Sequence, residues 1–207
     1  MKIVVVLFCL ISLNGLSQKD TCITEVGTSP NFQRSQCGRQ DRKGRWHGDY
    51  SELSYIGTLL NSCTRSLLHM RHGKKHGKAE KYFKVELTGF QKVEETHYRR
   101  GKETGKYTLW DRQNHLVQEG RHRNDYDVGM WTSYDSSGAV LWWKKYKNKH
   151  AYSEKRFYRG TIDYYVVVDT KKKIREEHYY DSEGVEIDIE AYRKIWKKRI
   201  RDEKERK

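Results

Sequence analysis

The chain has 207 residues, and its 42 lysine and arginine side chains outnumber its 28 aspartates and glutamates, giving a formal net charge of +14 at pH 7. Only 35% of the residues are hydrophobic and the mean hydropathy is -1.03, which excludes a thick globular core. Fifteen tyrosines and six tryptophans beside a single proline argue against a disordered chain, because disordered chains are poor in aromatic residues. The composition predicts a thin sheet in which aromatic rings and long lysine and arginine stems cover the backbone.

The N-terminus has the three parts of a secretory signal peptide. One lysine precedes an apolar run at 3–11, and the small residues Gly15 and Ser17 follow it. We therefore predict a signal peptide over 1–17 and an exported chain, periplasmic or secreted, that begins at Gln18. The alternative is a buried N-terminal strand. No later stretch approaches the roughly 18 apolar residues of a membrane span.

Residues 18–44 have the composition of a loop-rich lead-in, with glycine, proline, threonine and asparagine close together. Cys22 and Cys37 are candidates for a disulfide, which would close a loop of about 15 residues and stabilise the fold by about 3 kcal/mol. A bridge from Cys37 to Cys63 and a chain with no bridge remain alternatives. The cysteines lack metal-ligand spacing, so we expect no metal and no cofactor.

A pattern that occurs twice at an offset of 24 residues dominates the middle of the chain. A glycine is followed by aromatic residues two and five positions later and then by an aspartate that suits the start of a tight turn. The residues are Gly105, Tyr107, Trp110 and Asp111 in the first copy, and Gly129, Trp131, Tyr134 and Asp135 with Gly138 in the second. Each copy reads as strand, turn, strand, turn. Self-similarity at a fixed period predicts an array in which each unit buries its apolar surface against its neighbours.

The two rings of each copy lie three positions apart, at offsets of two and five from the glycine. Offsets of opposite parity place side chains on opposite faces of a regular strand, unless a bulge intervenes. We therefore expect one ring of each copy to pack in the core and the other to join a row on the open face.

This pattern of glycine, aromatic residues, aspartate and a following Leu or Val with Glu resembles the bacterial variant of MORN repeats, with a further copy beginning near Gly77. The resemblance implies an elongated antiparallel sheet that is used for binding, and some relatives carry an antitoxin label. We accordingly predict a mainly β protein, an antiparallel meander of MORN-like hairpins over 45–184.

The C-terminal residues 185–207 predict a basic amphipathic helix and tail. Asp188 suits the helix N-cap, and Glu190 suits the first turn. The apolar residues recur at helical spacing among lysines and arginines: Ala191, Tyr192, Ile195, Trp196 and Ile200. The favoured interpretation is a cap that buries these residues on the last strands. The alternatives are a helix that lies on an anionic membrane surface and a helix that binds nucleic acid or another polyanion.

No catalytic motif is present, and we predict a protein that is not an enzyme. Arg71 to His76 form the most basic turn, which we interpret as solvated rather than as a metal site because neighbouring positive charge opposes cation binding. The candidate binding surface is an aromatic and basic sheet face with part of the helix: Tyr107, Trp110, Trp131, Tyr134, Trp142, Lys144, Lys145, Trp196, Lys197 and Arg199.

The favoured function is an exported protein-interaction or envelope-surface binding module, whose partner is a protein or an anionic envelope surface. The first alternative is binding of a polyanion, namely lipid headgroups, a glycan or, less favoured, DNA. The second alternative is an antitoxin-like partner of a toxin. The third is a hydrolase that uses sheet carboxylates such as Glu119 and Glu177.

Overall fold

The computed structural model describes residues 4–7, 21–26, 32–56, 62–85 and 89–205. The described chain is mainly β, an antiparallel meander followed by one C-terminal helix, as the sequence predicts. It divides into two compact units. Unit one contains the described residues up to His115 together with His122–Asp125, and unit two contains Leu116–Arg121 and the described residues from Tyr126 onward.

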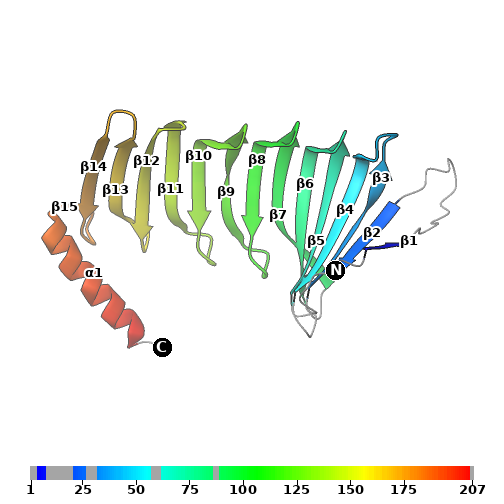
Figure 1. Ribbon diagram of the computed structural model, residues 1–207. Coiled ribbons are helices and arrows are strands. Elements are labelled where there is room, and N and C mark those ends of the chain that lie inside the picture. The colour runs from blue at the N-terminus through cyan, green and yellow to red at the C-terminus, as the bar shows by residue number, and fades with distance from the viewer. Residues whose placement is uncertain (1–3, 8–20, 27–31, 57–61, 86–88, 206–207) are drawn as a thin grey trace. The chain divides into compact units, whose positions relative to one another are not determined.

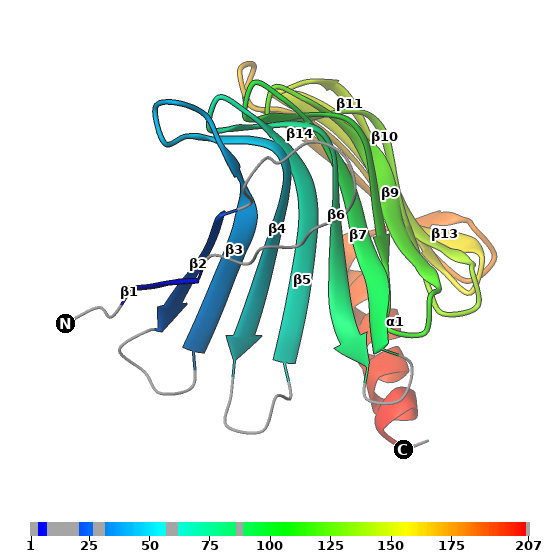
Figure 2. The same cartoon turned by 90° about the vertical axis from the view of Figure 1, so that its right-hand side faces the viewer.

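Unit one is a meander in which each strand pairs antiparallel with its neighbours in the chain (Figures 1 and 2). Its strands are β1 Val4–Leu7, β2 Thr21–Val26, β3 Phe32–Gln40, β4 Trp46–Ile56, β5 Ser62–Arg71, β6 Lys74–Val85, β7 Gly89–Arg99 and β8 Lys102–Trp110. Because successive strands run in opposite directions, the turns β3–β4, β5–β6 and β7–β8 lie at one edge of the sheet.

Unit two continues the same strand order along the chain. Its elements are β9 Leu116–Arg123, β10 Tyr126–Tyr134, β11 Val140–Asn148, β12 Ala151–Tyr158, β13 Thr161–Asp169, β14 Ile174–Tyr180, β15 Glu186–Ile187 and α1 Ile189–Lys204. The last two residues of β9 are grouped with unit one. Asp188 caps α1, because its carboxylate accepts hydrogen bonds from the backbone N–H groups of Glu190 and Ala191, as predicted.

The expected loop-rich lead-in at 18–44 is wrong, since β2 and β3 occupy most of it. The sequence of β3 carries no alternation of apolar and polar residues, because most of its side chains are polar on both faces of a one-layer sheet. Within the predicted signal peptide only β1 is described, and it pairs with β2. The rest of that segment lies outside the described residues, and the signal peptide stays a prediction.

Cys37 is disulfide-bonded, and the residue directly across from it in the β2–β3 register is Cys22. Cys22 and Cys37 are the candidate pair in the sequence, which by itself does not choose between this bridge and its alternatives. The bridge from Cys37 to Cys63 is excluded, because Cys63 is buried and is not in a disulfide.

The aspartate turns have the hydrogen bonds that their sequence predicts. Asp111 accepts from the backbone N–H groups of Gln113 and His115 at 2.8 Å each. Asp135 accepts from Ser137 and Ala139 at 2.8 and 3.0 Å. These bonds satisfy the donors of the turn locally, so each hairpin closes without help from the rest of the sheet.

The main apolar cluster of unit two lies on one face of β13. Tyr164, Val166 and Val168 alternate along the strand and are buried, and Tyr152 and Tyr179 of the neighbouring strands pack against them. The sheet has one layer here, so the cluster is built from cross-strand neighbours and not from a second sheet.

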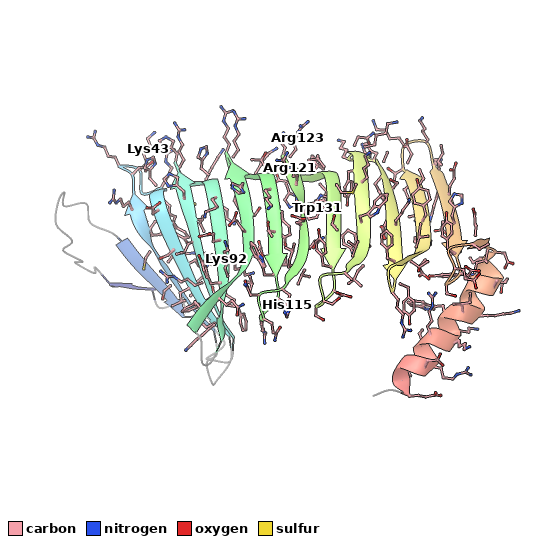
Figure 3. All side chains as sticks on the ribbon, turned by 180° about the vertical axis from the view of Figure 1, so that it is seen from behind. Lys43, Lys92, His115, Arg121, Arg123 and Trp131 are labelled. Carbon is pink, nitrogen blue, oxygen red and sulfur yellow. The ribbon has the colours of Figure 1, made fainter. Side chains whose placement is uncertain are left out.

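A second packing contact in unit two joins Trp131 to Gly120. The Trp131 side chain is buried, and a Cβ added at Gly120 would lie 2.1 Å from its Cδ2 atom. The indole Nε1 donates a hydrogen bond to the Arg121 carbonyl oxygen at 3.2 Å, and both residues are labelled in Figure 3. The glycine therefore leaves the space that the ring fills.

Tyrosine hydroxyls and glutamates form the polar counterpart of this packing. Tyr134 donates to Glu119 at 2.9 Å, and Glu177 accepts from Tyr164 at 3.0 Å and from Tyr179 at 2.5 Å. The Tyr179 hydroxyl and then the Arg175 guanidinium lower the pKa of Glu177. Tyr134 with Glu119 and Tyr164 with Glu177 join neighbouring strands, whereas Tyr179 and Arg175 lie on the same strand as Glu177.

We expect Gly120→Ala to destabilise the fold by about 3 kcal/mol, because the added methyl group overpacks against Trp131. The change in free energy of unfolding is measured by urea titration. In a Trp131→Leu background the same substitution should cost less than about 1 kcal/mol, since the clashing ring is absent. Equal costs in the two backgrounds would contradict the contact.

We also expect the sheet to lose stability between pH 10 and about pH 12. Burial and then the nearby Glu94 and Glu103 carboxylates raise the pKa of Tyr107 to about 12, and burial with the Glu177 hydrogen bond raises the pKa of Tyr164 to about 12. The folded chain favours the neutral hydroxyls, so their contribution is fully present below the unfolded value of about 10 and is lost as pH rises through 12.

Tyrosinate absorbance and far-UV circular dichroism, recorded together against pH, check this expectation. Ionisation and loss of strand signal should coincide. Tyr164→Phe should flatten the alkaline part of the stability curve, whereas Tyr126→Phe, at a tyrosine that is 51% exposed, should leave it unchanged. A tyrosinate signal that develops fully near pH 10 with the sheet intact would contradict it.

Candidate anion-binding edge

Three hairpin turns at one edge of unit one repeat a short basic sequence. Each turn has an arginine, a basic residue, a glycine and a further lysine or arginine: Arg42-Lys43-Gly44-Arg45, Arg71-His72-Gly73-Lys74 and Arg99-Arg100-Gly101-Lys102. They begin 29 and 28 residues apart and connect β3 to β4, β5 to β6 and β7 to β8. We call these the basic turns. Figure 3 shows Lys43 at this edge, His115 at the opposite edge and Lys92 between them.

The second and third basic turns have the tightest hairpin geometry. The backbone φ is positive at His72 and Gly73 (51° and 76°) and at Arg100 and Gly101 (55° and 85°). Two consecutive residues of positive φ are typical of a type I′ turn, whose twist matches that of the flanking strands. The glycine is therefore required by the backbone, and the bases on each side of it are held at the rim of the sheet.

The second and third basic turns are also each locked onto the basic turn before it. The Gly73 N–H donates to the Trp46 carbonyl oxygen and the Gly101 N–H donates to the Lys75 carbonyl oxygen, both at 2.8 Å. A Cβ at Gly73 would lie 3.5 Å from the Cβ of Arg45, and one at Gly101 would lie 3.6 Å from the Cβ of Lys74. The stem of the last base of one turn thus passes over the glycine of the next.

This stacking forms a basic pocket of about 620 Å³ between the turns. Five of its lining side chains are lysine or arginine and two are histidine: Arg45, Arg71, His72, Lys74, His76, Arg99 and Arg100. No lining residue among the described ones is acidic. Successive turns at one edge are two strands apart, which is about 9.5 Å, so the bases form a ladder with that step.

One carboxylate neutralises part of the pocket. Asp41 accepts from Arg45, with an N–O distance of 2.8 Å, and lies 3.6 Å from the His72 ring nitrogen. The Arg45 side chain, with backbone N–H groups of Lys43 and Arg45, holds the pKa of the Asp41 carboxyl well below its usual range. Arg71, Arg99 and Arg100 are exposed, and within the described part of the chain no ion pair joins them to an acid. Their charge is available to a ligand.

The predicted aromatic face does not exist as one surface. In unit one, Tyr107 packs with the His122 ring at 5.4 Å while Trp110 contacts the Lys92 ammonium at 4.9 Å, and the odd spacing places the two rings on opposite faces. In unit two, Trp131 is buried on Gly120 and Tyr134 points to Glu119 on the other face. The expected split of rings between faces is correct, but no single row results.

Unit two also divides the other predicted sheet residues. Lys144 lies over the Tyr152 ring at 3.9 Å and 3.3 Å from Glu154, so it takes part in the packed face. Trp142 lies on that face too, whereas Lys145, one residue from Lys144, points to the opposite face and is exposed. The adjacent residues therefore do not combine into one binding surface.

Helix α1 packs on the strands of unit two mainly through polar contacts. The Tyr192 hydroxyl donates to the Asp163 carboxylate at 2.9 Å, and the Arg199 guanidinium donates to the same carboxylate. The Tyr192 ring lies 4.8 Å from that of Tyr179, and Arg199 lies 4.0 Å from the Tyr158 ring. Arg199, a predicted ligand residue, is thus one of the residues that hold the helix in place.

The expected burial of the apolar helix residues is only partly correct. Tyr192 and Ile195 are half-buried, but Trp196 is 46% exposed and Ile200 is 40% exposed. The helix contacts Tyr158, the buried Asp163 and Tyr179 on three neighbouring strands, and the Asp163 carboxylate attracts a tyrosine hydroxyl and an arginine more strongly than an apolar stripe. Lys197 is exposed as well.

In the sequence only the middle basic turn stands out by its charge, and no local pattern links it to its neighbours. The signal was the recurrence of Arg-x-Gly followed by Lys or Arg, at a spacing that differs from the 24-residue offset of the aromatic pattern. In a meander, turns separated by two strands share an edge, and that rule would have brought the three turns together.

No family model matches this sequence, and no curated protein matches it either. The resemblance to MORN repeats therefore stays a prediction. Among the described residues, no group of three or more His, Cys, Asp or Glu side chains is placed to hold a metal ion. Within the same part of the chain, no helix has both the length and the apolar character needed to cross a membrane.

We expect Asp163→Ala to release α1 from the strands of unit two. The substitution leaves the half-buried Arg199 and the Tyr192 hydroxyl without their acceptor, so hydrogen exchange of the α1 amides should accelerate at least about tenfold while β13 and β14 stay protected. Arg193→Gln, which removes an exposed ion pair with Glu190, is the control and should have little effect. Unchanged exchange in α1 would show that Asp163 does not hold the helix.

Proposed function

We propose that this protein is a non-enzymatic binding module that holds an extended anionic polymer along the basic turns of unit one. The observation that carries the proposal is the basic pocket, which is lined by five permanent cations and two histidines. Arginine suits phosphate and sulfate groups because its planar guanidinium donates two parallel hydrogen bonds to them. The polyanion hypothesis therefore takes precedence over docking of a protein on an aromatic face, since the aromatic residues are divided between two faces.

The ladder favours a polymer over a small anion. The same basic sequence occurs three times and each copy is locked to the next, so the cations form a row with a step of about 9.5 Å. A chain with frequent anionic groups can place a charge at every step, and binding at several steps releases several counterions. A single small anion could contact only one pair of neighbouring basic turns.

The formal charge of +14 adds a long-range attraction to the local site. Such a field increases the rate of encounter with anionic polymers, and salt screens it within about 10 Å at 0.1 M. If the predicted export occurs, the relevant polymers are phosphate- or sulfate-bearing envelope and extracellular polymers. The expected consequence of both effects is binding that weakens steeply as salt rises.

We expect Arg71→Gln with Arg100→Gln to weaken binding of inorganic polyphosphate at least about tenfold and to reduce the slope of log affinity against log salt by about 1 to 2. Both side chains line the pocket and are exposed, so the fold should be kept. Affinity is measured by fluorescence anisotropy with labelled polyphosphate at several salt concentrations.

The matched control is Lys81→Gln with Lys84→Gln, which removes the same charge from exposed positions of β6 outside the basic turns. It should change affinity less than about twofold. Equal losses for the two double variants would assign binding to net charge alone, and a salt-independent affinity would contradict the proposal. Poly-glutamate, a polymer with carboxylates in place of phosphates, should bind more weakly than polyphosphate of similar length.

A further inference from the structure

We propose that the outer face of α1 docks on the surface of an anionic lipid bilayer. This inference concerns unit two and does not rest on the proposed function of the basic turns. It starts from an apolar stripe that the fold leaves uncovered and from the cations beside that stripe.

Three large apolar side chains of α1 face away from the strands. Ile189 is 40% exposed, Trp196 is 46% exposed and Ile200 is 40% exposed. At 3.6 residues per turn these positions fall within about 40° of one another around the helix axis, so they form one stripe. Val185, just before the helix, is 56% exposed. An apolar stripe of this kind is uncommon on a chain whose mean hydropathy is -1.03.

The contacts with the strands fix the direction in which this stripe points. Tyr192 and Arg199 both bind Asp163. Around the helix axis their positions lie about 40° and 60° from Trp196 and about 80° and 100° from Ile200, all on one side of the stripe. The side of the helix that carries them faces the sheet, so a rotation that buried Trp196 would move both side chains away from the Asp163 carboxylate. The stripe is therefore presented outward by the fold itself.

Basic side chains adjoin the stripe on the side away from the strands. The cations are Arg193, Lys194, Lys197, Arg201 and Lys204, and all five are exposed. Two acidic residues of the helix have described side chains: Glu190 pairs with Arg193, and Asp202 lines a pocket on the strand side. Asp188 and Glu205 are the caps at its two ends. The arc next to the stripe thus has a large positive excess.

This combination fits lipid better than a soluble polymer or a protein groove. A tryptophan favours the boundary between headgroups and acyl chains, and isoleucines beside it enter the acyl region. Lysine and arginine stems can lie along the membrane while their charges reach the phosphates of the headgroups. A soluble polyanion has no apolar phase for Trp196, and a narrow stripe of three residues is short for a helix-binding groove.

The test is flotation of the full chain with two kinds of vesicle, one of phosphatidylcholine alone and one in which a third of the lipid is phosphatidylglycerol. We expect binding to the anionic vesicles and little binding to the neutral ones. Trp196→Ala with Ile200→Ser should reduce affinity for the anionic vesicles about tenfold. All proteins compared share the same N-terminus, so any affinity of residues 3–11 for lipid is common to them.

Two matched controls separate docking of the α1 stripe from non-specific hydrophobic or electrostatic attraction to the vesicles. Tyr126→Ala with Leu141→Ser removes exposed apolar groups elsewhere in unit two and should change nothing. Lys197→Gln with Arg201→Gln should weaken binding several-fold more than Lys171→Gln with Lys172→Gln, which removes the same charge from the β13–β14 turn.

The inference is overturned if the anionic vesicles do not bind the chain, if Trp196→Ala with Ile200→Ser binds them as the parent does, or if the two pairs of charge variants lose equal affinity. Its failure is distinguishable from failure of the proposed function. The helix variants should keep full affinity for polyphosphate, whereas Arg71→Gln with Arg100→Gln should keep the dependence of vesicle binding on Trp196.

Discussion

The structure depends on one constraint, which is that a single-layer sheet has no second layer in which to bury apolar surface. Stability must come from neighbours across the strands, and the chain meets this need by placing rings over small residues and beside short aliphatic ones. Trp131 on Gly120 and Tyr164 beside Val166 are the clearest cases. Tyrosine hydroxyls paired with glutamates, such as Tyr134 with Glu119, keep the polar atoms of these rings satisfied.

Because of the same constraint, the side chains that are free to vary in chemistry lie in the turns at the edges of the sheet. Both faces of the sheet carry packing contacts between neighbouring strands, while the turns are held by short local bonds and, in the second and third basic turns, by the preceding hairpin. Asp111 and Asp135 close their turns with backbone N–H groups, whereas the second and third basic turns close with type I′ geometry around Gly73 and Gly101. Cationic side chains at the rim therefore cost the sheet little, and a row of them can be kept as a site.

Much of the fold could be predicted from sequence because its signals are local. The repeated glycine, aromatic and aspartate pattern predicted hairpins, and Asp188 marked the start of α1. Strands β2 and β3 were missed because a one-layer sheet allows polar residues on both faces, so alternation fails as a signal. The basic pocket was missed for another reason. Arg45, Arg71 and Arg99 are far apart in the chain, and only the pairing of the intervening strands brings them to one edge.

Helix α1 shows why an amphipathic pattern alone does not tell which side of a helix meets its own protein. The usual expectation places the apolar residues inward, and it fails in part here because the surface under the helix contains the buried carboxylate of Asp163. That carboxylate is satisfied by Tyr192 and Arg199, and these two contacts decide the rotation of the helix. Because the side of the helix with Tyr192 and Arg199 contacts the strands, Trp196 and Ile200 lie on the side that is exposed to solvent. The orientation of the apolar stripe is thus a consequence of one buried acid on β13.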